Sequence, residues 1–244
     1  MNYIIYDLEF NQKNSKDAED FGMPFEIIQI GAVKLDENLN HQGNFNALVK
    51  PTLYTEIHPY IENLTSITTD AVNSNKAFSL VYDDFLKFIG HEDFVLCIWG
   101  TSDIKEFVRN VKFHKLDLGR LSKKYIDIQA LASKYFNAPK GTKVGLSKVV
   151  DSFNLPLTGD FHDAFNDAYY TSEIFKKLFT PDIKPSLYDF NFSYRQSKAA
   201  LKHKIDTVSL FKQLEKMYNR KLTDDEKSMI KLAYIMGKTN QFLL

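Results

Sequence analysis

The sequence has very little cysteine. Its 244 residues include a single one, Cys97, which lies in an apolar run at 94–99, so no disulfide can form within the chain. We interpret this thiol as a small core residue. No apolar run approaches the roughly 18 residues that a membrane-spanning helix needs. The N-terminus has no basic region followed by an apolar block, which argues against a signal peptide. We therefore expect a cytoplasmic protein in a reducing compartment.

The chain also lacks net charge, with 31 basic and 31 acidic residues. This balance argues against non-specific coating of nucleic acid. It hides an asymmetry, because acids outnumber bases in residues 1–180 and bases outnumber acids in residues 181–244. Such an asymmetry is typical of a tail that faces nucleic acid. It is equally typical of a solvated helical face that pairs with an acidic body, and both interpretations stay open.

Several catalytic motifs are missing. The chain has no G-x-S-x-G hydrolase elbow, no G-x-x-x-x-G-K phosphate loop and no Cys/His spacing for zinc. What it has is an ordinary globular composition, 44% hydrophobic and 25% charged, with 20 Phe and 13 Tyr that we assign mainly to a core. A chain of this length is sufficient for one domain, or for one domain with an appendage.

The order of the apolar patterns predicts an α/β fold. Three strands at 2–9, 25–35 and 44–49 follow one another, which favours an antiparallel meander. A fully apolar strand at 94–99 and a short strand at 125–128 then alternate with helical patterns. We expect a mixed five-stranded sheet flanked by helices.

Helical spacing places the connecting elements and the domain boundary. The predicted helices of the body lie at 57–64, 70–72, 77–89, 102–114, 129–136, 146–153 and 161–179. Pro181 and Pro185 then interrupt the pattern, so we divide the chain into a domain at 1–180 and a C-terminal helical extension at 181–244. The extension should contain two helices, at 207–218 and 224–236, the second of which begins with a capping box at 223–226.

The first predicted strand ends in two acids. Asp7 and Glu9 are two residues apart, so in a strand their side chains point to the same face. Two anions held side by side repel each other and lose hydration. A bound Mg²⁺ or Mn²⁺ offsets this cost, because both ions favour oxygen ligands. These residues alone are equally consistent with a strand that ends at solvent with two surface acids.

Two acids further along the chain lie in sequence contexts that would bring them close to Asp7 and Glu9. Asp103 follows the buried strand and begins a helix, where ligand sites gather in α/β folds, although an acid there also stabilises a helix start by itself. Asp167 lies four residues after Asp163, which would put both on one face of a helix. His162 precedes or begins this helix. Histidine side chains in general titrate near neutrality and can take a proton from water. A lone His near acids is more often a plain surface residue.

Together, Asp7, Glu9, Asp103, Asp167 and His162 are the set of groups that two-metal phosphoryl hydrolysis needs. Two divalent ions about 3.5–4 Å apart stabilise the attacking and leaving oxygens. Four carboxylates offset the positive charge of the ions, and a histidine deprotonates the attacking water. The pattern therefore predicts a hydrolase with two divalent metal ions, Mg²⁺ or Mn²⁺.

Three motifs in this order resemble those of the DEDDh 3′–5′ exonucleases of the ribonuclease H-like superfamily. They are YDLEF at 6–10, WGTSD at 99–103 and HDAFNDA at 162–168, supported by PFEIIQIGAV at 24–33 and LTSIT at 64–68. The resemblance covers residues 1 to about 180. It looks most like the branch that includes histone-mRNA-end exonucleases and bacterial sporulation-inhibitor-like exonucleases. Each motif alone is weak, but their order and spacing are highly specific.

The resemblance implies a ribonuclease H-like fold and a role for each acid. Asp7, Glu9 and Asp167 would bind the first metal, with Asp7 bridging to the second. Asp103 would bind the second metal, through water, and His162 would be the general base.

The resemblance also implies where substrate lies. Leu64 and Thr65 would meet the terminal bases, and Phe10 would lie near the terminal sugar. Two residues depart from the pattern, Ser102 at a position that is often aromatic and Ser66 at a position that is commonly glycine. Both departures leave the base contacts and the substrate choice open.

One further acid, Glu26, matches a common acid of the second strand, and we assign it no catalytic role.

The activity implied is a metal-dependent 3′–5′ exonuclease that hydrolyses phosphodiester bonds at 3′ ends of single-stranded nucleic acid. RNA is slightly favoured over DNA, and the product would be a nucleoside 5′-monophosphate; no membrane partner is expected. The alternative is a catalytically inactive nucleic-acid-binding or regulatory protein on the same fold, although such a protein need not keep carboxylates that repel. For the extension at 181–244, two amphipathic helices packed on the body and a substrate clamp both stay open.

Overall fold

The computed structural model describes residues 1–13, 23–190 and 206–238, so the remaining parts of the predicted extension lie outside the described residues. The chain forms two compact units, Met1–Ser193 and Tyr194–Leu244. No helix in the described ranges combines the length and the apolar character that a membrane crossing requires.

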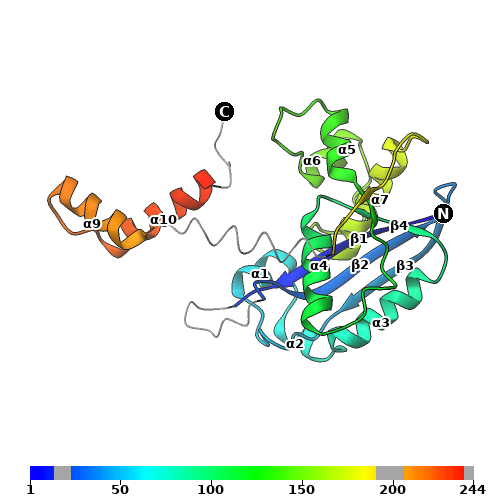
Figure 1. Ribbon diagram of the computed structural model, residues 1–244, viewed down its shortest axis with the longest axis horizontal. Helices are drawn as coiled ribbons and strands as arrows, with labels where there is room; N and C mark the ends of the chain where they lie inside the picture. The colour runs from blue at the N-terminus through cyan, green and yellow to red at the C-terminus, as the bar shows by residue number, and fades with distance from the viewer. Residues whose placement is uncertain (14–22, 191–205, 239–244) are drawn as a thin grey trace. The chain divides into compact units, whose positions relative to one another are not determined.

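The first unit is built on one mixed sheet. Within the described residues the strand order is β3-β2-β1-β4-β5-β6. Figure 1 labels the first four strands of the chain, β1 to β4. β1 (Asn2–Asn11), β2 (Glu26–Leu35) and β3 (His41–Leu48) pair antiparallel, whereas β4 (Phe94–Ile98) is parallel to β1. β5 (Lys124–Asp127) is parallel to β4. The predicted meander and the mixed sheet are confirmed.

A sixth strand extends this sheet beyond the five that were predicted. β6 (Ser186–Leu187) pairs antiparallel with β5, and it is too short to leave a periodic pattern in the sequence. Phe190, which follows it, is buried in the core. The first unit therefore continues past residue 180.

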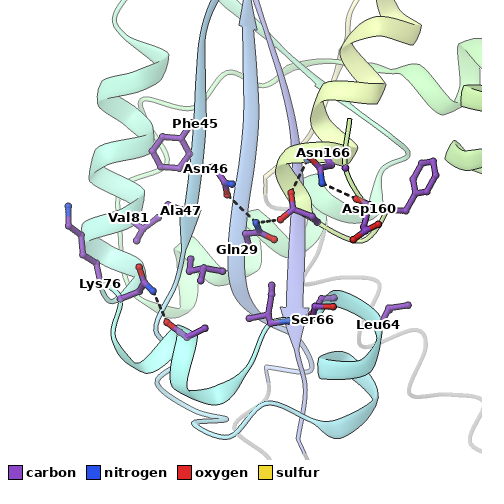
Figure 2. Close-up of a pocket in the computed structure, with 18 of the residues that line it drawn as sticks. Gln29, Phe45, Asn46, Ala47, Leu64, Ser66, Lys76, Val81, Asp160 and Asn166 are labelled. Carbon is purple, nitrogen blue, oxygen red and sulfur yellow. Dashed lines mark hydrogen bonds between the residues drawn. The ribbon is translucent and has the colours of Figure 1, made fainter. Parts of the chain in front are cut away.

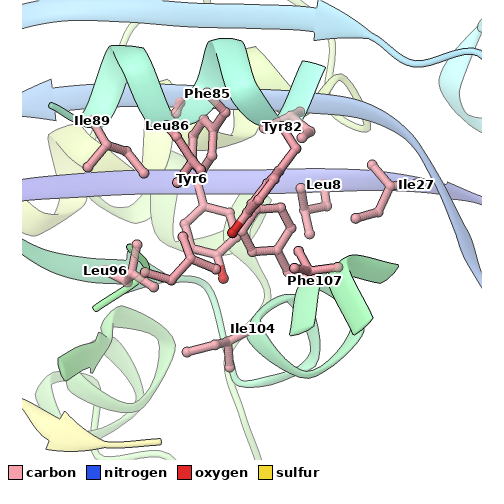
Figure 3. Close-up of a cluster of buried hydrophobic side chains, with 14 of the residues drawn as sticks. Tyr6, Leu8, Ile27, Tyr82, Phe85, Leu86, Ile89, Leu96, Ile104 and Phe107 are labelled. Atoms are coloured by element: carbon pink, nitrogen blue, oxygen red, sulfur yellow. The ribbon is translucent and has the colours of Figure 1, made fainter. Parts of the chain in front are cut away.

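Alternation along β1 divides the core into two layers. Ile4, Tyr6 and Leu8 pack into the cluster that Figure 3 shows, where side chains of α3 (Phe78–Ile89) and α4 (Ser102–Phe113) surround the Tyr6 ring. On the opposite face, Tyr3 and Ile5 pack against α5 (Ile128–Tyr135), α6 (Leu146–Ser152) and α7 (Ala164–Leu178). Asp7 and Glu9 continue the odd-numbered series, so they point toward the face that α7 covers.

The start of α7 lies directly on β2. A Cβ atom at Gly31 would stand 2.2 Å from the carbonyl carbon of Ala164, so only glycine allows the helix to approach this closely. The helix begins at Ala164, three residues later than predicted, because His162 has a left-handed φ of 64° and Asp163 is extended and caps the helix.

Two short helices connect β3 to α3. α1 (Pro59–Thr65) begins with a proline after a His58 side-chain cap, and α2 (Thr69–Asn73) begins after a Thr68 cap. Ser66 is the C-cap of α1, and its φ of 59° is left-handed, a conformation that glycine adopts more readily than serine.

The second unit contains the two predicted helices, α9 (Thr207–Tyr218) and α10 (Asp224–Lys238). The Thr223 backbone N–H donates to Glu226 Oε2 at 2.9 Å, and the Glu226 N–H donates to Thr223 Oγ1 at 3.3 Å. This reciprocal pair confirms the predicted capping box.

Candidate active site

The end of β1 presents Asp7 and Glu9 side by side. Both are half-buried, and their β2 neighbours across the antiparallel pairing are Gly31 and Gln29. A bulge follows Glu9, where the pairing skips one residue of β2 before Phe10. Bulges of this kind are frequent next to active sites, where they redirect a side chain. The two acids therefore have the same-face arrangement that their spacing predicts.

The first turn of α7 brings two further groups to this pair. Asp167 is 8% exposed, its Oδ2 accepts a hydrogen bond from the His162 N–H at 3.2 Å, and its Oδ1 is buried with no hydrogen-bond partner. One donor atom from each of Glu9, His162 and Asp167 lies within 4.8 Å of the others. His162 itself is exposed.

Asp103 completes the cluster from the start of α4. It is 9% exposed, and its carboxylate raises the pKa of Asp7 more than any other neighbouring charge does. The pKa of Asp7 is raised well above its ordinary value. Burial is the largest cause, and the charges of Asp103, Glu9 and Asp167 follow in order of size. The structure thus brings all four acids that the sequence singled out into one electrostatic cluster.

Burial raises the pKa of the other three acids as well, and the charges of neighbouring carboxylates add to this effect. Burial, then Asp167 and Asp103, raise the pKa of Glu9 to about 9. Burial, then Asp167, raise the pKa of Asp103 to about 8, and burial raises the pKa of Asp167 to about 6. In the described parts of the chain, no Lys or Arg forms a salt bridge with any of the four.

These residues fit a divalent metal ion. Their donor atoms are hard carboxylate oxygens, one of which, Asp167 Oδ1, lacks any protein partner although it is buried. A divalent cation would offset the repulsion that raises each pKa, because it favours the charged form of every neighbouring carboxylate. Hard cations such as Mg²⁺ and Mn²⁺ are the ions that prefer such ligands.

A groove of about 1110 Å³ is lined by two of the predicted substrate residues and by Gln29, the register partner of Glu9, but by none of the four acids or His162. Leu64 and Thr65 are among its lining residues, and so is Asp163, which follows His162 in the chain. Figure 2 shows the groove, with Leu64 labelled. The Thr65 hydroxyl donates to the Ile61 carbonyl and accepts from an N–H, so it is engaged by the end of α1. Phe10 does not line this groove; its ring packs 6.2 Å from that of Phe25.

The Asp163 carboxylate belongs to the start of α7. It caps α7 from just outside the helix, and its charge still raises the pKa of Asp167 and of Glu9. Its Oδ1 accepts from the Asn166 N–H at 2.9 Å, and its Oδ2 accepts from Gln29 Nε2 at 2.8 Å. With both oxygens hydrogen-bonded, Asp163 differs from Asp167, whose Oδ1 is unpartnered.

Two buried residues that received no catalytic role anchor the segment that leads to α1. The Asn11 amide nitrogen donates to the carbonyls of Tyr54 and Glu56 at 2.8 and 2.9 Å, and its oxygen accepts from the His58 N–H at 2.9 Å. Glu26 accepts from three successive backbone N–H groups, those of residues 52–54. An isolated Asn or Glu on a strand carries no sequence signal for such a role.

Comparison with known families gives one match that covers most of the first unit. The family model RNase_T, described as an exonuclease, matches residues 4–175. This range contains all eight residues that the sequence singled out for metal, base and substrate contacts.

Two curated proteins are similar over about the same region. A PolC-type DNA polymerase III of Clostridium perfringens is 30% identical over 181 residues, which cover 72% of this chain and 11% of the polymerase. The 3′–5′ exonuclease crn-4 of Caenorhabditis elegans is 22% identical over 188 residues, which cover 72% of this chain and 62% of crn-4. The chain therefore corresponds to only part of the length of either relative.

A solved structure has a similar backbone. The nuclease domain of 3′hExo, a DEDDh family member bound to rAMP, superposes with a TM-score of 0.64 at 19% identity and covers 77% of this chain and 96% of that domain. At this identity the similarity shows a shared ribonuclease H-like fold.

Proposed function

Because this chain belongs to the DEDDh 3′–5′ exonuclease family, we propose that it hydrolyses the terminal phosphodiester bond at 3′ ends of single-stranded nucleic acid. The product would be a nucleoside 5′-monophosphate. The observation that carries the proposal is the cluster of Asp7, Glu9, Asp103 and Asp167, four largely buried carboxylates without a cationic partner in the described chain, with His162 beside them.

The proposal assigns each acid a part in binding metal. The family uses divalent metal ions, and here Asp7, Glu9 and Asp167 would hold one ion while Asp103 would hold a second. Such ions, when bound, stabilise the charge on the attacking and leaving oxygens of a phosphoryl transfer. We favour Mg²⁺ or Mn²⁺, because the donors are carboxylate oxygens.

The chain's own groups then bind, orient and move a proton. His162 accepts a proton from the water that attacks the terminal phosphorus, and its exposed position supports exchange of that proton with solvent. The phosphorus–oxygen bond to the preceding 3′ oxygen breaks, which leaves a chain one nucleotide shorter. Leu64 and Thr65, on the groove wall, would contact the terminal bases, and Phe10 would lie near the terminal sugar.

RNA is the slightly favoured substrate in this proposal. Its support is the rAMP bound to the similar nuclease domain, together with the resemblance to histone-mRNA-end exonucleases. A protein tells RNA from DNA by contacts to the 2′ hydroxyl, so the preference is a property of the site around the terminal sugar.

The test is a time course on matched single-stranded RNA and DNA oligonucleotides of one sequence, labelled at the 5′ end, with Mg²⁺ or Mn²⁺. We expect a ladder that shortens one nucleotide at a time from the 3′ end, release of 5′-monophosphates, and no reaction in excess chelator. Blocking the 3′ end should stop degradation, whereas blocking the 5′ end should not.

The same assay separates the alternative of a non-cleaving protein. Binding of the oligonucleotide without release of any nucleotide, with both metals and both sugars, would favour a regulatory protein on the same fold. Activity that persists in excess chelator would contradict the metal-dependent mechanism.

A further inference from the structure

The two β2 residues opposite the acids both contact the start of α7. Gly31 is the register partner of Asp7, and Gln29 is the register partner of Glu9. Gly31 allows the backbone of Ala164 to lie against the strand. β1 therefore carries two of the acids, and the neighbouring strand β2 carries the residues against which α7, the helix of Asp167, begins.

Gln29 makes hydrogen bonds with every part of its amide. It is 3% exposed, its Oε1 accepts from the Ala164 N–H at 3.1 Å, and its Nε2 donates to Asp163 Oδ2 at 2.8 Å and to Asn46 Oδ1 at 3.1 Å. Figure 2 shows Gln29 at the centre of this network, with Asn46 of β3 beside it. The side chain thus links β3, β2 and the first turn of α7.

A carboxamide suits this position because it is both donor and acceptor. The start of α7 presents an N–H at Ala164, which needs an acceptor, and the cap carboxylate of Asp163, which needs a donor. A glutamate at position 29 would satisfy the N–H but would set a second anion against Asp163. An alanine would leave the Ala164 N–H without its acceptor and Asp163 Oδ2 without its donor.

We propose that Gln29 is a positioning residue that holds His162 and Asp167 in place for hydrolysis, by fixing the residues Asp163 and Ala164 that lie between them. This inference rests on the proposed exonuclease function. Asp163 is directly bonded to His162 in the chain, and the Ala164 N–H begins the turn that carries Asp167. Movement of this turn changes the distance from Glu9 to both groups, which now lie within 4.8 Å of it and of each other.

The experiment exchanges donor and acceptor between two residues. In Gln29→Glu, the new carboxylate at position 29 faces the carboxylate of Asp163. In Asp163→Asn, the amide nitrogen of Gln29 faces a second amide nitrogen at position 163. In the double variant, the new carboxylate at position 29 accepts from the Ala164 N–H and from the new amide at position 163. That amide still caps the Asn166 N–H through its oxygen, and the Asn46 amide turns to donate to the carboxylate. The net charge of the pair is the same as in the natural protein.

The expected result is a loss in each single variant and recovery in the double variant. Each single change should lower kcat by about 10- to 100-fold, the range that a small misplacement of reacting groups costs, with a smaller change in KM. The double variant should return to within about threefold of the natural protein, a coupling that a double-mutant cycle measures. Gln42→Ala is the control, because it removes a surface Gln–Asp hydrogen bond of 3.0 Å on β3 that does not touch α7.

A second readout does not depend on metal or substrate. Amide hydrogen exchange in the metal-free protein should be faster at Ala164 and Asn166 in both single variants than in the natural protein, and restored in the double variant. Amides in the middle of α7 should keep their protection, which shows that the fold is intact.

Three outcomes would overturn the inference while the natural protein is active: single variants with unchanged kcat, a double variant that recovers stability but not kcat, or exchange at Ala164 that does not respond. A natural protein that releases no nucleotide in the same assay would instead contradict the proposed function, so the two failures are distinguishable.

Discussion

Buried carboxylates on neighbouring elements of the first unit have opposite surroundings. Glu26 on β2 accepts from three backbone N–H groups and one hydroxyl, and Glu106 on α4 pairs with Arg109 at 2.6 Å and Lys105 at 3.3 Å. Asp7 and Glu9 on β1 have other carboxylates as their main charged neighbours. The first set has cations or several hydrogen-bond donors as partners, whereas in the described residues no Lys or Arg pairs with Asp7 or Glu9.

The difference separates structural acids from candidate functional ones. A carboxylate that accepts several hydrogen bonds stabilises the loop or helix that donates them. A group of carboxylates that repel one another destabilises the fold unless a cation binds. Perturbed acids gathered in one place are therefore a better indication of function than burial alone.

The largest expected effect on the rate of nucleotide release comes from a change of Asp7, one of the carboxylates that repel one another. Asp7→Asn should lower the rate of nucleotide release by about 1,000-fold, because removal of a group that organises charge stabilisation costs about 10²- to 10³-fold. It should not lower the thermal midpoint in chelator, since it removes repulsion. A single-turnover assay with circular dichroism as the folding control measures both. Near-natural activity in a folded Asp7→Asn variant would remove Asp7 from the mechanism.

The opposite pattern is expected for Glu26→Ala. The variant lacks the carboxylate that accepts hydrogen bonds from the buried N–H groups of Leu53 and Tyr54. The free energy of unfolding should therefore fall by about 3 kcal/mol. Urea denaturation measures this loss. Stability equal to that of the natural protein would show that the segment at 52–54 finds other partners.

The pH dependence of stability should show the raised pKa values of the clustered acids Glu9, Asp103 and Asp167. The folded protein holds protons on Asp167, Asp103 and Glu9 up to a pH of about 6, 8 and 9, whereas unfolded carboxyls lose them near 4. The folded state therefore binds more protons in this window. The stabilisation is complete below the unfolded pKa and is lost as the pH rises through the folded values.

In chelator, the free energy of unfolding should thus decrease from about pH 4 to about pH 9, by up to about 1.4 kcal/mol per pH unit for each proton involved. Asp103→Asn should make the decrease smaller, because one titrating group is gone. Excess Mg²⁺ should remove most of it by favouring the charged carboxylates. A flat profile in chelator would contradict the raised pKa values.

The smallest effect on stability is expected when Glu106 of α4 loses its Arg109 partner. Arg109→Met should destabilise the protein by about 1 kcal/mol, because Arg109 keeps 23% exposure and Lys105 still contacts Glu106. Thermal unfolding at two salt concentrations measures it. A loss as large as that of Glu26→Ala would mean that Lys105 does not replace the missing charge.

Prediction from the sequence succeeded where a local pattern carries the information. The same-face placement of Asp7 and Glu9 follows from strand alternation, and the meander follows from three apolar runs with turns between them. The position of Asp103 at a helix start follows from the glycine after β4.

It was incomplete where partners are distant in the chain. The spacing placed Asp163 near Asp167, but it did not show that Asp163 caps the helix or that Gln29, 134 residues away, donates to it. Asn11 and Glu26 anchor the segment before α1 through contacts that no spacing rule contains.

The amino-acid sequence by itself determined which residue types are available to the site and on which face of its own element each one lies, because the periods of strands and helices are local properties. Only the tertiary structure decided which buried acids have partners. Glu26 and Asp7 are both acids on buried strands, and the difference between them comes from what other segments bring: three backbone N–H groups to one, and other carboxylates to the other. That choice depends on long-range packing, which composition and spacing do not contain.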